Sequence, residues 1–411
     1  MHRKKLIFTT FVILASLQSV IAQRQSALVA PQTTDPNITT NLNNHYVSIN
    51  RGVSSKSQLV VFFPGTGGVG ANQREFNHSA ADLGFHAINL TYPNDEPVNG
   101  LCGGTNTDLD CYGNVRLEIK DGTNRSALVN VNRANSIENR LIKLLIYLHN
   151  QVPNDNWSQF LINNSEINWS KLIVSGHSQG GGHAGIIGRY HSVVRVVMFS
   201  AMDFSGIRNS PANWIALPET TPNASTASKF WGFSHQRDES VNFTQLSTRV
   251  WPAYGMPPFG KIINVDSSNP PYDNTHSLTT NIECSNFHGC VVVDARLVYK
   301  NGIPVFKPVW EYLLSGTLAP LSLTSLQFLK AGITVSRPHV GATTKLYRLV
   351  VEGSGFDANS IALVNRATVE TEFIDQGEVR AKLPAGKIGR VGSSTVQVRN
   401  QSGVASNIVN F

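Results

Sequence analysis

Short apolar runs alternate with helical patterns over the first half of the chain. Residues 59–63 and 85–90 are apolar enough to be buried strands, and segment 72–83 between them has the spacing of a helix. Another apolar run, 171–175, follows a long helical segment. Because parallel strands need a crossover between them, this alternation predicts an α/β fold: a mostly parallel sheet flanked by helices.

The helical segment before residue 171 has the clearest periodicity. Ser136 is suited to cap it, and apolar residues repeat on one face, namely Ile137, Leu141, Leu144, Leu145 and Leu148. Three strands are then expected at 193–199, 229–233 and 261–265, and a last helix at 308–314. The α/β pattern therefore continues to about residue 316.

Past Gly316 the pattern changes to short alternating runs with frequent Gly and Ser and no amphipathic helix. This predicts a small all-β, immunoglobulin-like sandwich over residues 319–411, after an α/β catalytic domain over 46–318. Residues 23–45 are polar and turn-rich, and we expect them to be a flexible N-terminal segment.

The first residues are typical of a secretory signal peptide. A basic stretch at 2–5 precedes an apolar run at 6–17, and Ala22 ends a suitable cleavage site. A membrane anchor is the rival interpretation, but the run is too short to span a bilayer comfortably, and no other run approaches that length. We therefore expect residues 1–22 to be removed from a secreted or periplasmic protein without a membrane span.

The charge and the cysteine content of the chain limit the partners and ligands that we expect. The formal net charge is +7, and subtracting the three basic residues of segment 1–22 leaves +4, with no Lys/Arg cluster. A nucleic-acid partner is therefore not expected. The four cysteines allow three disulfide connectivities, and short separations favour Cys102–Cys111 and Cys284–Cys290. Zinc binding is the alternative, but no CxxC spacing supports it, so no metal is expected.

The candidate nucleophile is Ser178, in Gly-His-Ser-Gln-Gly at 176–180. An apolar strand leads into this motif and a helical segment follows it, which is the context of a nucleophile elbow. The glycines are needed because a side chain on either side of the strained turn would meet neighbouring backbone. A flexible loop that happens to hold a serine is the alternative.

A serine nucleophile also needs N–H donors for the developing oxyanion. The helix N-terminus supplies the backbone N–H of Gln179, and the Gly-rich turn after strand 59–63 supplies that of Thr66. A phosphate-binding loop is the competing interpretation of this turn. No P-loop lysine accompanies it, so no nucleotide cofactor is expected.

The acid and the base should follow in the order Ser…Asp…His. Asp238 lies just past a predicted strand and is favoured over Glu239 and Asp203. For the base, His276 is preferred because it lies soon after the expected strand 261–265. His288, inside the expected Cys284–Cys290 loop, is the alternative.

With these residues in order, the chain resembles the α/β-hydrolase superfamily, and most of all a group of secreted bacterial members. The likeness covers residues 50–316, through Pro64-Gly65-Thr66-Gly67, the 176–181 motif, Asp238 and the two histidine segments. The loop after His276 is similar in position to the base loop of cutinase-like enzymes, which favours His276 as the base. The first loop departs from the usual His-Gly, with Pro64-Gly65 in its place.

The C-terminal part resembles an IPT/TIG immunoglobulin-like domain, through Gly353-Ser354-Gly355-Phe356, Leu383-Pro384-Ala385 and residues 396–400. Such domains are spacers or binding modules.

The resemblance and the triad together imply a serine hydrolase that cleaves a small-molecule or polymer ester through an acyl-enzyme, without a cofactor. A peptidase or lipase on the same triad, or a non-catalytic binding protein with a hydrolase fold, are the alternatives. The sequence leaves the oligomeric state open.

Overall fold

The computed structural model describes most of the chain: residues 24–218, 221–315, 322–330, 333–335, 347–354, 356, 360–375, 378–383, 394–399 and 405–410. The expected signal peptide, residues 1–22, lies outside these ranges. So does the expected domain boundary at residues 318 and 319.

A nine-stranded sheet organises residues 24–315, in the order β1-β2-β4-β3-β7-β8-β11-β13-β12. Its strands are β1 (Arg24–Val29), β2 (His45–Asn50), β3 (Leu59–Phe63), β4 (His86–Asn89), β7 (Leu172–His177), β8 (Arg195–Phe199), β11 (Phe230–His235), β12 (Ile263–Asn264) and β13 (Ser277–Thr280). β1 and β2 are antiparallel to their neighbours, and every pair from β4 to β12 is parallel. The predicted fold class is confirmed: the sheet is mostly parallel and flanked by helices.

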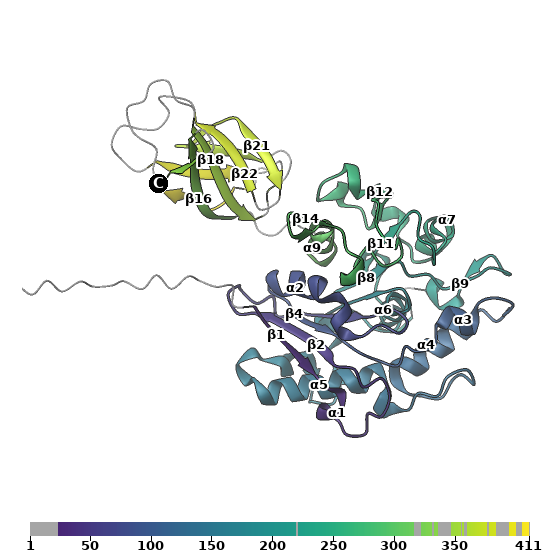
Figure 1. The fold of residues 1–411 in the computed structure, drawn as a ribbon. Helices are drawn as coiled ribbons and strands as arrows, with labels where there is room; N and C mark the ends of the chain where they lie inside the picture. Colours follow the sequence, from purple (N-terminus) through teal and green to yellow (C-terminus); the bar gives the residue numbers. More distant parts are fainter. Residues whose placement is uncertain are drawn as a thin grey trace, which may run out of the picture.

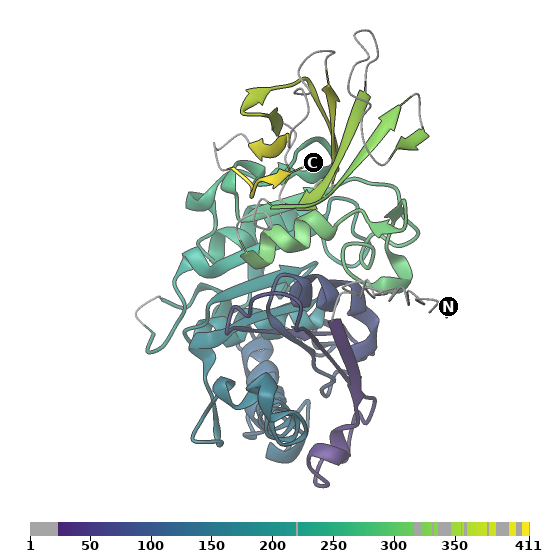
Figure 2. The ribbon, with the colours of Figure 1, turned by 90° about the vertical axis from the view of Figure 1, so that its left-hand side faces the viewer.

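Helices cover both faces of this sheet. Val60 and Phe62 of β3 belong to one core cluster, together with residues of α2 (Arg74–Asp82) and α9 (Lys307–Ser315). Val61 and Phe63 belong to the other, with residues of α4 (Cys111–Asp121), α5 (Ile137–Gln151) and α6 (Gln179–Tyr190). Figure 1 shows α2 and α5 on opposite sides of the strands, and Figure 2 shows the same for α9 and α5. A parallel sheet buried on both faces explains the continuous apolar runs.

Apart from the strand expected at 261–265, the elements expected from the sequence pattern form close to their predicted bounds. In α5, the Ser136 side chain accepts a hydrogen bond from the Asn139 N–H, as an N-cap should. The other α-helices and strands of this part are short: α1 (Pro31–Thr34), α3 (Val98–Cys102), α7 (Phe243–Gln245), α8 (Trp251–Ala253), β5 (Leu161–Ile162), β6 (Glu166–Ile167), β9 (Phe204–Ser205), β10 (Ser210–Pro211), β14 (Tyr299–Lys300) and β15 (Ile303–Pro304).

The N-terminal segment differs from its prediction. Residues 24–29 form edge strand β1, and the chain after it is tied down by two buried side chains. Asn135 Oδ1 accepts the N–H groups of Thr39 and Thr40, and Arg140 donates to the Thr40 and Asn41 carbonyls. Polar residues that looked loosely held from composition are thus ordered by long-range hydrogen bonds.

Strand β13 was not expected from the sequence, and it matters for the site. It lies between β11 and β12, in parallel with both. Its sequence, Ser-Leu-Thr-Thr, carries one large apolar side chain, so it gives little hydrophobic signal. The expected strand at 261–265 shrinks to the two residues of β12 at the sheet edge.

Both local disulfides form as predicted, Cys102–Cys111 and Cys284–Cys290. The first lies within residues 93–131. This segment contains α3 and α4, and the disulfide joins the end of α3 to the start of α4.

The described residues past 322 are all-β, as expected from their pattern. They form a five-stranded antiparallel sheet, β17-β16-β18-β22-β21, and a four-stranded one, β20-β19-β23-β24. The strands are β16 (Ser322–Lys330), β17 (Ile333–Val335), β18 (Tyr347–Ser354), β19 (Ile361–Val364), β20 (Ala367–Thr368), β21 (Thr371–Asp375), β22 (Glu378–Leu383), β23 (Thr395–Arg399) and β24 (Val409–Asn410). Their apolar side chains form a core cluster of their own. None of the helices in the described ranges has the length and apolar character needed to cross a membrane.

Candidate active site

Ser178 occupies a sharp turn between β7 and α6. Its φ of 54° and ψ of −121° are unusual for a residue with a side chain, and such strain persists only where the surroundings enforce it. A Cβ on Gly180 would lie 1.9 Å from the Phe63 carbonyl oxygen, and one on Gly176 would lie 2.3 Å from the Gly180 backbone. Glycine is therefore required on both sides of the turn, as the sequence analysis expected of a nucleophile elbow.

Ser178 is partly buried and lines a cavity of about 460 Å³. The wall combines main chain of the 65–68 turn, amide side chains and a few apolar groups. Its other lining residues are Gly65, Thr66, Gly68, Asn72, Gln73, Pro97, Val98, Asn99, Arg116, His177, Gln179, Ser200, Met202, Ser240, Val241, His288 and Val293. Helices α3 and α4 contribute to this wall through Val98, Asn99 and Arg116.

The two expected oxyanion donors, Thr66 and Gln179, both lie on this cavity. Gln179 is the first residue of α6, so its N–H has no acceptor within the helix. The Thr66 hydroxyl donates to Gln179 Oε1 at 2.8 Å, and the Val98 N–H donates to the same oxygen at 3.3 Å. These bonds tie the turn after β3 to the start of α6.

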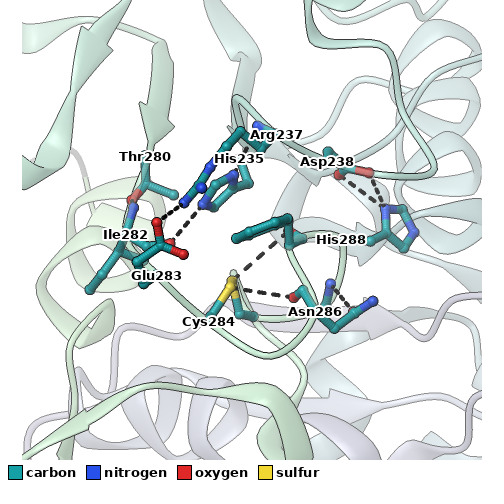
Figure 3. The surroundings of a disulfide bond; sticks show 12 residues. His235, Arg237, Asp238, Thr280, Ile282, Glu283, Cys284, Asn286 and His288 are labelled. Carbon is teal, nitrogen blue, oxygen red and sulfur yellow. Dashed lines mark hydrogen bonds and ion pairs between the residues drawn. A yellow bond between two sulfur atoms is a disulfide. The ribbon is translucent and has the colours of Figure 1, made fainter.

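Asp238 and His288 lie together, and Figure 3 shows the imidazole turned toward the carboxylate. His288 Nδ1 is 2.9 Å and 3.0 Å from the two Asp238 oxygens, and the Asp238 side chain is fully buried. Burial alone would raise the pKa of Asp238. The hydrogen bond and charge of His288, with the hydrogen bond from the Ser240 N–H, outweigh burial and lower that pKa below 3.8. The carboxylate is thus ionised near neutral pH.

His276 lies away from this cavity, which corrects the preference for it as the base. Its ring stacks between Trp231 and Phe259, with centroids 3.6 Å and 4.7 Å away, and its Nδ1 bonds to the Phe230 carbonyl. The reason is strand β13. His276 immediately precedes this strand and lies at its amino end, whereas Ser178 follows the carboxyl end of parallel strand β7. His288 comes after the carboxyl end of β13.

The two alternative acids have other partners. Asp203 accepts hydrogen bonds from Arg116 Nε and Nη2 and from Trp214 Nε1, all of them buried. Glu239 accepts the backbone N–H of His288 at 3.1 Å and a hydrogen bond from Asn286. Asp238 is therefore the acid that contacts the imidazole, as the sequence analysis favoured.

Two side chains in contact with these residues were missed at the sequence level. Arg116 lines the cavity and donates through Nη1 to the Gln179 carbonyl at 2.8 Å. Glu239 was weighed only as a rival acid, and its contact with the His288 backbone was not foreseen. Neither lies in a motif, so only the three-dimensional contacts identify them.

Among the described residues, one group of side chains lies close enough together to be considered as metal ligands. His235, Cys284 and Cys290 have ligand atoms within 4.8 Å of one another. Both sulfur atoms are joined in the disulfide, and His235 bonds to the Arg237 N–H and the Ile282 carbonyl, each at 2.9 Å. The group cannot bind a metal ion while the disulfide is intact.

Four features together match one known arrangement: the observed strand order, an elbow after β7, an acid after β11 and a histidine after β13. The chain has the α/β-hydrolase fold.

Comparison with known proteins finds matches among solved structures. No protein-family model matches the chain, and no curated protein does. Among solved structures, TT1662 from Thermus thermophilus aligns with 12% identity and a TM-score of 0.34, over 71% of this chain and 98% of that one. A protein named as a dienelactone hydrolase, from Klebsiella pneumoniae subsp. pneumoniae MGH 78578, aligns with 11% identity and a TM-score of 0.32, over 70% and 95%. Esterase B from Lactobacillus rhamnosis (HN001) aligns with 10% identity and a TM-score of 0.33, over 63% and 74%.

Proposed function

We propose that this protein is a secreted serine hydrolase that cleaves an ester through an acyl-enzyme, with Ser178 as nucleophile, His288 as base and Asp238 as the orienting acid. The observation that supports this proposal most is the bond between Asp238 and His288 Nδ1, on a histidine that lines the same cavity as Ser178. A serine hydroxyl is a weak nucleophile unless an oriented base accepts its proton.

The contacts support a role for each group. Asp238 accepts a hydrogen bond from the Nδ1–H of His288, which leaves Nε2 to take the proton of the Ser178 hydroxyl as the serine oxygen attacks the ester carbonyl. The backbone N–H groups of Thr66 and Gln179 stabilise the oxyanion. When the intermediate collapses, the alcohol leaves with the proton from His288. Water then attacks the acyl-enzyme by the same route, releasing the acid and restoring Ser178.

The cavity favours small or moderately polar esters. Its volume of about 460 Å³ and its amide-bearing wall, with Asn72, Gln73, Asn99 and Gln179, suit a short acyl group better than a long apolar chain. Peptidase and lipase activity would use the same triad, so amide and long-chain substrates belong in the same assay series.

Labelling with a fluorophosphonate probe tests the nucleophile directly. We expect the probe to modify Ser178, identified by peptide mapping, and we expect 4-nitrophenyl acetate hydrolysis to fall by several orders of magnitude in Ser178→Ala. Ser205→Ala, in β9, is the control and should keep activity. Equal labelling or equal turnover of wild type and Ser178→Ala would overturn the proposal in favour of a non-catalytic binding protein.

Two further parts of the proposal concern the ends of the chain. We propose that residues 1–22 are a signal peptide, so the exported protein should begin at Gln23 on N-terminal sequencing. We also propose that the C-terminal β region is an IPT/TIG-like spacer or binding module. A shortened chain ending at Ser315 should then hydrolyse soluble esters at the full-length rate, and total loss would contradict an accessory role.

A further inference from the structure

His288 lies in a segment without regular secondary structure, between the end of β13 and the short helical turn at Asp294–Arg296. A base in such a segment must be held within a fraction of an ångström of its productive position. Asp238 fixes only the imidazole. The backbone of His288 needs its own support, and the structure supplies it from two elements far away in sequence.

The first support is His177, the residue directly before Ser178. Its Nε2 lies 2.8 Å from the His288 carbonyl oxygen, and the two rings have centroids 4.6 Å apart. A carbonyl oxygen can only accept, so His177 carries its proton on Nε2 and donates it there. This bond occupies the Nε2 of His177, and it joins the elbow to the segment that carries the base.

The second support is Glu239, the residue directly after Asp238. Its Oε2 accepts the backbone N–H of His288 at 3.1 Å, and its other oxygen accepts a hydrogen bond from Asn286 in the same segment. Two adjacent acids thus hold one histidine at different atoms: Asp238 at Nδ1 and Glu239 at the backbone N–H.

We infer that His177 and Glu239 are positioning residues that hold the main chain of His288 at its carbonyl oxygen and its N–H, and so align the imidazole with Ser178. This inference rests on the proposed triad. His177 is buried and Glu239 is exposed, so loss of the His177 bond should matter more. For this role, neither side chain needs to contact the reacting atoms of the substrate.

The test compares variants that remove each bond with variants that keep it. His177→Leu removes the donor, whereas His177→Gln can still present an N–H to the same carbonyl. Glu239→Ala removes the acceptor, whereas Glu239→Gln keeps a carbonyl oxygen. Glu283→Ala is the matched surface control, because Glu283 lies beside the same segment, is 81% exposed and bonds only to Arg237 in the described residues.

With 4-nitrophenyl acetate, we expect kcat to fall roughly 10- to 100-fold in His177→Leu, with little change in KM. We expect a loss of about fivefold in Glu239→Ala, and partial recovery in both conservative variants. The far-downfield proton resonance of the His288 Nδ1–H bond to Asp238 should broaden in the two disruptive variants and stay sharp in Glu283→Ala. If His177 and Glu239 served folding alone, their variants would lose thermal stability without a selective fall in kcat.

Ser178→Ala and His288→Ala are measured in the same series, which separates two kinds of failure. If these two are inactive while His177→Leu and Glu239→Ala keep the wild-type kcat and a sharp resonance, the positioning roles are wrong and the triad stands. If Ser178→Ala is active, the proposed function fails and the positioning roles fail with it. Should His177→Leu not fold, the exposed site at Glu239 still gives a decisive comparison.

Discussion

Arg116 and Asp203 form a buried ion pair at two points, with Nε–Oδ2 at 2.6 Å and Nη2–Oδ1 at 2.5 Å. The same guanidinium donates through Nη1 to the Gln179 carbonyl, and Trp214 Nε1 donates to Asp203. A Cβ on Gly182 would lie 2.2 Å from Arg116 Nη2, so glycine at this position of α6 makes room for the guanidinium. The pair therefore connects α4, the segment after β8 and the first residue of α6.

Removing one member of this pair should destabilise the fold strongly. Arg116→Met leaves the Asp203 carboxylate buried without its cation, and we expect a loss of roughly 3–5 kcal/mol in the free energy of unfolding, measured by urea denaturation. Arg125→Ala is the control. Arg125 pairs with Asp121 nearer the surface, and its loss should cost no more than about 1 kcal/mol. Equal losses in the two variants would contradict a special role for the buried pair.

The two candidate histidines should respond in opposite ways to substitution. His288→Ala removes the proposed base, and we expect kcat with 4-nitrophenyl acetate to fall by a factor of about 10⁴ or more while the fold is kept. His276→Phe retains a ring between Trp231 and Phe259 but loses the bond to the Phe230 carbonyl. We expect it to lose stability, by about 1 kcal/mol, and to keep kcat within a few-fold.

Steady-state kinetics and thermal unfolding on the same preparations check this contrast. A collapse of kcat in His276→Phe with an unchanged melting temperature would reverse the assignment of the base.

The elbow could be predicted from the sequence because its determinants are local. An apolar strand, a serine between glycines and a helix follow one another within about twenty residues, and the glycines meet backbone only a few ångströms away. Asp238 could also be chosen from the sequence as the candidate acid, because it follows the well-marked strand β11. The contact between Asp238 and His288 could not be predicted, since it depended on recognising β13, a strand of four residues with three small polar side chains.

Contacts between distant segments were beyond sequence reasoning for a different reason. Arg116 and Asp203 are 87 residues apart, and neither residue type signals its partner. The order of residues 24–45 likewise depends on Asn135 and Arg140, about a hundred residues away. Such pairs become visible only when the fold brings their segments together.

Acid should destabilise this protein through its buried histidines. Burial, as the largest cause, lowers the pKa of His45 and His177 to about 3 and that of His191 to about 4, so the folded state keeps all three neutral. The unfolded chain binds protons at these groups from a pKa of 6.5 downward. The free energy of unfolding should therefore fall as pH drops below 6.5, with the loss continuing toward pH 3–4.

Urea denaturation at a series of pH values between about 8 and 4.5 measures this dependence. His191→Gln removes one titrating group and should flatten the curve. Asp238 has a linkage of the same sign in a lower pH range: its pKa is lowered, so its contribution to stability is present above pH 3.8 and is lost only below that value. Constant stability down to pH 4.5 would contradict neutral buried histidines.

The Cys284–Cys290 disulfide should affect catalysis through His288, which lies inside its loop. The cysteines are six residues apart, and loop closure of this size contributes about 2 kcal/mol to stability. We expect the double variant Cys284→Ser and Cys290→Ser to lose about tenfold in kcat, since the segment that carries the base gains freedom. The double variant Cys102→Ser and Cys111→Ser opens a loop of similar size, with nine residues of separation, that contains no member of the triad. This control variant should lose a comparable free energy of unfolding in urea but much less kcat. Equal kcat in the wild type and both double variants would contradict the prediction. The hydrogen bonds to Asp238, Glu239 and His177 would then hold His288 without help from the disulfide.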